Sequence, residues 1–454
     1  MKLKSIQARK VDMVHGPILK GILLFSLPIF LGSVFQQLYN MADSIIVGKY
    51  VSANALAAVG STATITMMLV GIMTGFPTGA SVVAAQFAGA GETEKIKRTI
   101  STTLYFLLGL AVVLTVVGQF LAPYIMRWVN VPEEVMADAM AYFRIYVGGM
   151  VFMALYNFFS AFLRALGDSV TPLIFLIISS ILNIIGDLFF VLVLHMDVPG
   201  VATATVLAQA ISVALCLIYV SHTSPYFQFK KGELVFDRKL LRDILRLGLP
   251  SSIQASITSL GMVMVQGLIN SYGTISMAAY TAANKMEQLC GQPISGVAMS
   301  LSLYVGQNIG AGDQERAKKG LWQSLGVVVG VSAVLSAVIY FTGRSIMHLF
   351  VNDTDADVIE VGAKFMRIWA PLLFGHVFGQ CFVSFLRGAG DSLNSMISMF
   401  FDLGVRTIMA YVFALACGLG FMGIAWSIPC GWFGCSIYAL IMYRTGIWKR
   451  KAVV

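Results

Sequence analysis

Long apolar runs separated by short charged gaps cover almost the whole chain. Residues 21–42, 50–91, 99–126 and 247–284, for example, contain no charged side chain. A helix crosses the hydrocarbon core of a bilayer with about 20 apolar residues, so each of these runs holds at least one span. The pattern therefore predicts an all-α membrane protein.

The gaps divide the apolar runs into twelve expected transmembrane helices. Composition agrees with this reading, because 57% of the 454 residues are hydrophobic and 12% are charged, whereas the surface of a soluble protein of this size needs far more charge. The helices are expected near residues 20–48, 54–89, 96–122, 135–163, 171–194, 199–221, 242–270, 276–309, 316–342, 357–386, 393–417 and 420–444.

Basic residues gather in alternate gaps. The two chain ends and the gaps near 91–98, 164–168, 222–246, 310–319 and 387–391 hold 23 of the 31 Lys and Arg. The opposite loops carry only Lys49, Arg127 and Arg344. Because cytoplasmic loops are enriched in Lys and Arg, we expect both termini to be cytoplasmic. This distribution explains the net charge of +9 and gives no indication of nucleic-acid binding.

Three short motifs recur at a nearly constant spacing of 221 to 223 residues. They predict two six-helix lobes, residues 1–221 and 240–454, joined by a cytoplasmic linker, 222–239. Six helices per half leave both lobes in the same orientation, related by a pseudo-twofold axis along the membrane normal. The motif pairs are Gln86–Lys95 with Gln307–Arg316, Phe162–Ser169 with Phe385–Ser392, and Ser26–Pro28 with Gly248–Pro250.

Two acidic residues, Asp43 and Asp187, lie inside apolar stretches. A carboxylate at membrane depth costs about 2.5–3.5 kcal/mol on insertion scales and is rare without a function. Gln36 and Tyr39 share a helix face with Asp43, and Asn183 shares one with Asp187. These faces should meet each other or a wet cavity, where the acid pair exchanges a proton or a cation. The alternative is a buried polar cluster that only holds helices 1, 5 and 6 together.

The chain resembles the multidrug and toxic compound extrusion (MATE) family over about residues 17–445. The segments that carry the resemblance are Gln36–Asp43, Phe162–Ser169, Asn183–Asp187 and Gly200–Thr205. The resemblance implies a secondary antiporter in a prokaryotic plasma membrane. Such a protein exports organic cations and amphipathic drugs, and so contributes to antibiotic resistance. It takes up protons or sodium in exchange while its two lobes rock around a central cleft.

The resemblance also implies roles for single residues. The expected cation-coupling residues are Gln36, Tyr39, Asp43, Asn183, Asp187 and Thr205, and Asp43 and Asp187 would be metal ligands only if sodium is the coupling ion. Members of the NorM type carry further acids in helices 7 and 10. The matching positions here are Thr258 and His376, so the pattern is closer to the DinF/MepA-like bacterial branch.

In the second half, Glu287 of helix 8 is expected to attract organic cations, or else to form a structural pair with Lys285 or another helix. Asp402 and Arg406, four residues apart in helix 11, are expected to form an internal ion pair. The expected substrate-contact residues are Glu287, Asn157, Met67, Met68 and His376.

Other functional classes fit the sequence less well. A flippase for lipid-linked precursors, from the same wider superfamily, should line its cavity with arginine and carry extra helices. A channel needs a ring of like polar residues, but Val265 and Ala410 stand at the repeat positions of Asp43 and Asp187. No nucleophile–base spacing or nucleotide-binding motif suggests an enzyme or a nucleotide-driven pump. We expect no cofactor beyond H⁺ or Na⁺ as coupling ion, no partner beyond the bilayer and a small molecule, and a monomer.

The charge pattern predicts the topology. Single cysteines introduced at Lys230 and Asp355 should react with a membrane-impermeant thiol reagent from opposite sides of the membrane, Lys230 from the cytoplasm. Labelling of both positions from the same side would contradict it.

Overall fold

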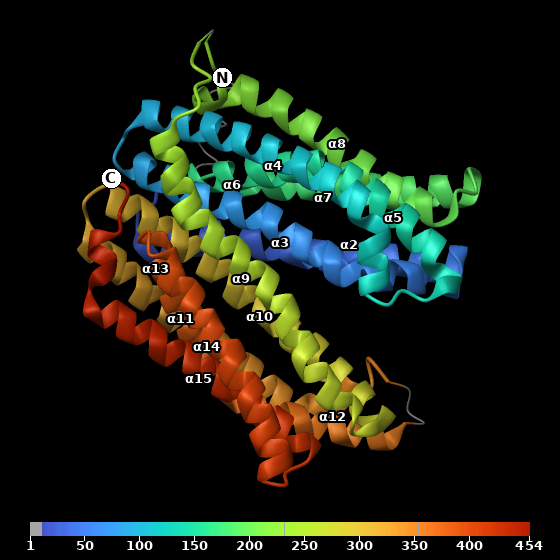
Figure 1. Cartoon of the computed structure of the whole chain (residues 1–454). Helices are drawn as coiled ribbons and strands as arrows, with labels where there is room; N and C mark the ends of the chain where they lie inside the picture. Colours follow the sequence, from blue (N-terminus) through green and yellow to red (C-terminus); the bar gives the residue numbers. More distant parts are fainter. Residues whose placement is uncertain (1–10, 231, 352–354) are drawn as a thin grey trace. The chain divides into compact units, whose positions relative to one another are not determined.

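The computed structural model describes residues 11–230, 232–351 and 355–454. Within these ranges the chain is helical almost throughout and contains no strand (Figure 1). The helices are α2 (Ile18–Ile46), α3 (Ala53–Gly89), α4 (Thr93–Trp128), α5 (Met136–Gly148), α6 (Met150–Ala165), α7 (Val170–Leu188), α8 (Asp197–Thr223), α9 (Arg238–Asn270), α10 (Gly273–Gly310), α11 (Gln314–Met347), α12 (Ala356–Trp369), α13 (Leu373–Gly388), α14 (Ser392–Tyr411) and α15 (Phe421–Thr445).

The described residues confirm a multi-pass membrane protein. Nine helical stretches are long and apolar enough to cross a bilayer, and the bent pair of α5 and α6 makes a tenth. The α9 and α10 helices, 33 and 38 residues long, bring the number of long helical segments to the expected twelve. Each segment corresponds in order to one helix expected from the apolar runs.

Two of the twelve segments are not single helices. The expected helix 135–163 breaks at Gly149, where α5 and α6 meet at 48°. A side chain at Gly149 would clash with Val206 of α8, so this glycine lets α8 approach the break. In the second half, a short 3₁₀ turn containing Pro371 separates α12 from α13. The apolar pattern alone does not reveal either break.

The internal repeat is also present in the backbone. Gly91 and Gly312 adopt φ angles of +74° and +81°, and Gly167 and Gly390 adopt +90° and +89°. These are left-handed conformations that only glycine enters without strain, and they close the same turn in each half. The π-helical turns Phe189–Val193 and Val412–Ala416 also lie 223 residues apart. The two halves therefore share their turns as well as their motifs.

Packing divides the chain into two compact units. Of the described residues, unit 1 comprises 11–12 and 27–256, and unit 2 comprises 13–26 and those from 257 to 454. The packing boundary thus lies inside α9, whereas the sequence repeat suggests a boundary in the linker. In unit 1 the linker is fastened to α4, because the Nζ of Lys97 lies 2.9 Å from both the Glu233 carboxylate and the Gln228 carbonyl oxygen.

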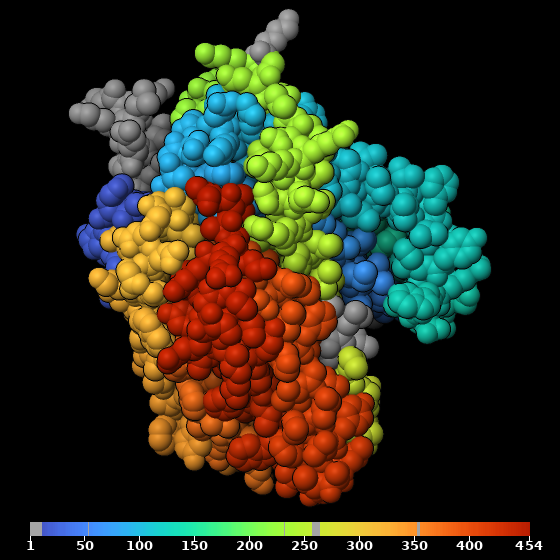
Figure 2. All heavy atoms as spheres, turned by 60° about the vertical axis from the view of Figure 1, so that its left-hand side comes forward, coloured from blue at the N-terminus to red at the C-terminus, as the bar shows by residue number. Residues whose placement is uncertain are grey.

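The outer faces of the helices suit a lipid environment. In unit 2, α14 and α15 pack along each other and form one continuous face (Figure 2). Large apolar side chains on these two helices are exposed, among them Ile408, Ile437 and Ile441. Exposure of so many large apolar side chains to water would be unfavourable, whereas the acyl chains of lipids solvate them.

Small residues let α3 and the first part of α9 pack in close contact within unit 1. Gly75 and Gly79 of α3 face Ser252 and Gly248 of α9, and a Cβ added at either glycine would clash with the α9 backbone. Without a hydrophobic driving force between helices in lipid, close backbone approach of this kind is a main source of association.

This contact predicts a stability effect. Gly79→Ala should destabilise the protein by about 1–3 kcal/mol, the usual cost of overpacking, and lower its melting temperature in detergent. Gly326→Ala in α11 is the matched control, because a Cβ there meets no atom within 4 Å. Equal melting temperatures for the two variants would show that the α3–α9 contact is not tight.

Candidate functional site

Unit 1 contains a cavity of about 580 Å³ in its helical bundle. Five of the six helical segments of the first half contribute to its wall, all except α4. The polar lining residues are Gln36, Tyr39, Asn40, Asp43 and Ser44 from α2, Thr62, Thr66 and Thr74 from α3, Tyr142 and Tyr146 from α5, Tyr156 and Asn157 from α6, Ser179, Ser180 and Asn183 from α7, and Thr205 and Gln209 from α8.

The two intramembrane aspartates meet at this cavity. Asp43 lines it, whereas Asp187 is fully buried. The Oδ1 atom of each of these two carboxyl groups is buried with no hydrogen-bond partner. Two neighbouring buried carboxylates repel each other, which favours a proton on one of them. The expectation that the polar faces of helices 1 and 5 meet each other or a cavity is confirmed, because Asp43 and Asn183 line the same cavity.

Asn183 connects the acid pair to the next helix. In the orientation of its amide that satisfies its neighbours, Nδ2 donates to Oδ2 of Asp187 at 3.1 Å. The amide oxygen then accepts from the backbone N–H of Thr205 at 3.2 Å and from the hydroxyl of Thr205 at 3.1 Å. Tyr39 of α2 lines the same cavity as Thr205. The hydrogen bonds therefore join α7 to α8 beside this face of α2.

Aromatic side chains form another part of the wall. Tyr142 and Tyr146 of α5 stack with their ring centroids 6.0 Å apart, and Tyr156 and Tyr39 line the same space. Aromatic faces attract organic cations and accept apolar groups equally well. Met67, an adaptable apolar side chain, is also part of the lining. The wall suits a ligand that is large, partly apolar and positively charged.

The structure brings together most of the residues expected from the sequence. Gln36, Tyr39, Asp43, Asn183, Thr205, Asn157 and Met67 line the cavity, and Asp187 lies behind it. Met68 does not line it. Glu287 and His376 belong to unit 2 and have no part in this cavity. The side chain of Thr258 lies outside those that the structure describes.

Several lining residues had no distinct signal in the sequence. Tyr142, Tyr146 and Tyr156 resemble the other aromatic residues of apolar helices. Thr62 and Thr66 are spaced i,i+4, which places them on one face of α3, and this spacing was the one pattern that could have revealed them. Hydroxyls in membrane helices commonly bond to their own backbone, so the spacing alone carries little information.

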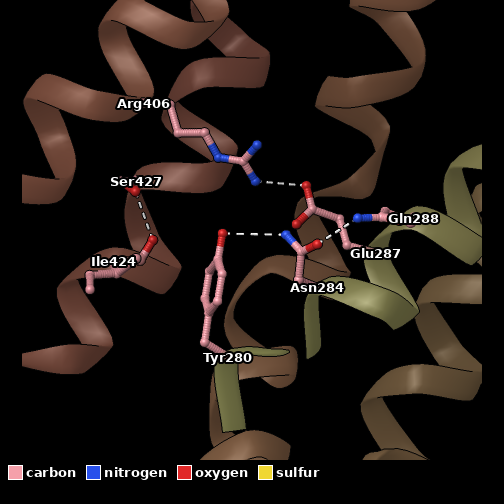
Figure 3. Close-up of polar contacts among 7 residues, drawn as sticks. All are labelled: Tyr280, Asn284, Glu287, Gln288, Arg406, Ile424 and Ser427. Carbon is pink, nitrogen blue, oxygen red and sulfur yellow. Dashed lines mark hydrogen bonds and ion pairs between the residues drawn. The ribbon is translucent and has the colours of Figure 1, made fainter. Parts of the chain in front are cut away.

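The expected ion pair between Asp402 and Arg406 is wrong. Arg406 of α14 instead bonds to Glu287 of α10, with 2.7 Å between Nη2 and Oε1 (Figure 3). For Glu287, the structure thus shows the expected alternative of a structural pair with another helix. An i,i+4 pair was expected from the spacing within one helix, but the cross-helix partner is 119 residues away in sequence. His376 of α13 packs against Trp432, with ring centroids 5.4 Å apart.

Oxygen atoms that could bind a cation are concentrated in unit 1. The carboxylates of Asp43 and Asp187, with the oxygens of Asn183, Thr205 and Tyr39, offer hard ligands of the kind that sodium or a proton takes. Within the described residues no group of three or more His, Cys, Asp or Glu side chains is arranged to hold a metal ion. Sodium would therefore depend on amide and hydroxyl oxygens in addition to the acid pair.

Comparison with known proteins identifies the same architecture. Residues 28–189 and 250–412 match the family model MatE, one segment in each half. The chain is 31% identical over 448 residues to the probable multidrug resistance protein YoeA of Bacillus subtilis, which covers 96% of this chain and 95% of that protein. It is 21% identical over 425 residues to the multidrug export protein MepA of Staphylococcus saprophyticus, covering 94% and 93%.

Solved structures agree on the fold. The chain superposes on a structure described as the outward-facing conformation of a multidrug resistance MATE family transporter of the MOP superfamily. The TM-score is 0.90 at 24% identity, and the match covers 97% of this chain and 99% of that one. A match of this extent shows that the whole chain, and not one half, has the common fold.

The hydrogen-bond network predicts a difference between two asparagines that line the same cavity. Asn183→Leu should destabilise the protein by about 1–3 kcal/mol for each buried partner left unpaired. Asn157→Leu should have a smaller effect, because the amide of Asn157 bonds only to the Met153 carbonyl of its own helix. Melting temperatures in detergent test this, and equal losses would show that Asn183 is not part of a buried network.

Proposed function

This chain belongs to the MatE family, and on that premise we propose that it is a secondary antiporter that exports organic cations and amphipathic drugs. The observation that carries the proposal is the cavity of unit 1, where Asp43 and the buried Asp187 adjoin a wall of tyrosines. Its volume of about 580 Å³ lies in the range of drug-sized sites. The names of YoeA and MepA, both multidrug proteins, support the same substrate class.

We propose protons as the coupling ion. Asp187 is fully buried, and the described lining of the cavity contains no basic residue to balance the two carboxylates, so one proton on the pair is the simplest compensation. When that proton is lost, both carboxylates are negatively charged. Two adjacent negative charges are strongly unfavourable in a low dielectric. An organic cation at Asp43, which faces the cavity, restores the balance. A proton and a cationic substrate therefore compete to neutralise the same negative charge, and such competition is what an antiporter needs to exchange one for the other.

Sodium is the alternative coupling ion, with the two aspartates as its ligands together with Asn183, Thr205 and Tyr39. This choice needs both carboxylates ionised and turned to one cation, but Asp187 is fully buried and does not line the cavity. The burial of Asp187 therefore supports the proton.

A lipid-linked precursor flippase is the alternative function. Phosphate groups call for arginine or lysine in the cavity wall. The described lining of this cavity contains an aspartate and no basic residue, which favours cationic substrates.

The proposed cycle opens the cavity to one side of the membrane at a time. Proton binding at the acid pair lowers the affinity for the cation on the outer side, and cation binding on the cytoplasmic side favours loss of the proton. Each ligand shifts the conformational equilibrium only by its difference in affinity for the two states. Coupling is therefore lost when either aspartate can no longer ionise.

The test is efflux of a fluorescent organic cation from proteoliposomes with a proton gradient and a sodium gradient imposed separately. The wild type should transport with the proton gradient alone. Asp43→Asn and Asp187→Asn should each reduce transport to the level of empty liposomes while the protein stays folded. Glu315→Gln, a change at an exposed side chain on α11, is the matched control.

Two outcomes would contradict the proposal in different ways. Transport driven only by a sodium gradient would show that sodium, not the proton, is the coupling ion, and the proposal of an exporter would stand. Normal proton-driven transport by either aspartate variant would remove that residue from coupling.

A further inference from the structure

Unit 2 holds a buried cluster of three charged side chains that the proposed exchange does not use. Glu287 lies on α10, and Asp402 and Arg406 lie one turn apart on α14. The guanidinium of Arg406 bonds to Glu287 at 2.7 Å, and the two side chains keep exposures of only 20% and 16%. Asp402 is 9% exposed, and its Oδ1 is buried with no hydrogen-bond partner.

The charges of this cluster do not balance as they stand. One guanidinium can neutralise one carboxylate, and the charge of Arg406 is already balanced by Glu287. An ionised Asp402 would then be an uncompensated charge in a buried, low-dielectric place, which is strongly unfavourable. The cluster is neutral when Asp402 carries a proton.

Other nearby groups do not supply the missing positive charge. Tyr280 of α10 and Cys435 of α15 are neutral in this surrounding and carry no positive charge in any form. His376 of α13 lies near Arg406, whose charge opposes a second positive charge there. On α15, Gly431 is pressed against Asp402 and Arg406 so closely that a Cβ would clash with both. This packing excludes a further side chain from the carboxyl group.

The three residues of the cluster correspond, through the internal repeat, to residues of the first-half cavity. The motif spacings map Arg406 onto Asn183, Asp402 onto Ser179 and Glu287 onto Thr66. All three first-half residues line the cavity of unit 1. The buried charged residues of the second half thus stand at positions equivalent to residues that line the candidate ion site of the first half.

We propose that Asp402 is a second proton-binding site, and that Arg406 exchanges between Glu287 and Asp402 to control it. In one state Arg406 pairs with Glu287 and Asp402 is a neutral acid. In the other, Arg406 pairs with Asp402, whose O–H bond breaks, and the proton leaves to water. Asp402 precedes Arg406 by four residues, the spacing at which helical side chains reach each other, so the guanidinium can serve either acid.

This inference rests on the proposed function for its role in transport. A cation that binds Glu287 removes the partner of Arg406 and sends the guanidinium to Asp402. One positive charge arrives at the cluster and one proton leaves, so the net charge is unchanged. Unit 2 would then exchange a cation for a proton with chemistry different from that of the acid pair in unit 1.

Infrared difference spectroscopy of the purified protein tests the proposal, because a protonated carboxyl has a C=O stretch that shifts in deuterium oxide. At neutral pH the wild type should show such a band that Asp402→Asn removes. Glu287→Gln should also remove it, since Arg406 then pairs with an ionised Asp402. In Glu287→Gln/Arg406→Met no guanidinium is left to stabilise the carboxylate, and the band should return. Glu315→Gln should leave it unchanged.

Two results would overturn the proposal. An unchanged band in Asp402→Asn would mean that Asp402 holds no proton. If the band that Asp402→Asn removes is still present in folded Glu287→Gln, then Asp402 is a permanent neutral acid and Arg406 does not exchange. If Glu287→Gln does not fold, Asp402→Asn alone decides whether the proton is present. Because no transport is measured, these outcomes are independent of the efflux test of the acid pair.

Discussion

The requirement that every buried charge has a counter-charge or a proton governs this protein. In the hydrocarbon core no water compensates an isolated carboxylate. In the proposed exchange Asp43 and Asp187 meet the requirement by sharing a proton, and in the structure Glu287 meets it through Arg406. Both solutions can be undone by an arriving cation. A site that is neutral only in combination with a mobile charge is therefore suited to exchange.

Close helix packing makes these arrangements possible. The glycines of α3 allow the backbone of α9 to approach within unit 1, and Gly431 does the same for α14 and α15 in unit 2. Backbone contact of this kind fixes the position of helices that lipid would otherwise solvate equally well on every face. The charged side chains then meet at hydrogen-bond distance, which a looser bundle would not ensure.

Much of the fold could be predicted from the sequence, because the physics behind it is local. Apolar runs, charged gaps and repeated Gly turns lie in short stretches of chain, and each expected helix has its counterpart. The polar faces of Asp43 and Asp187 were also readable, since their spacing within one helix is fixed by helical geometry.

The remaining features depend on contacts between distant segments. The choice of Glu287 over Asp402 by Arg406 is a contest between two carboxylates, and only one of them lies on the same helix. The break at Gly149 depends on Val206 of α8. The tyrosines of α5 and α6 in the cavity wall became recognisable only once four other segments had surrounded them.

The two halves share a scaffold and differ in charge, and this difference has a physical meaning. At matched positions, Asn183 of unit 1 donates a neutral amide N–H to an acid, whereas Arg406 of unit 2 brings a full positive charge. If the two proposals hold, the amide leaves the acid pair to hold its own proton, whereas the guanidinium satisfies one acid and leaves the proton to the other. The repeated fold then carries two solutions to the same electrostatic problem, and the residue at this one position determines which carboxyl group titrates.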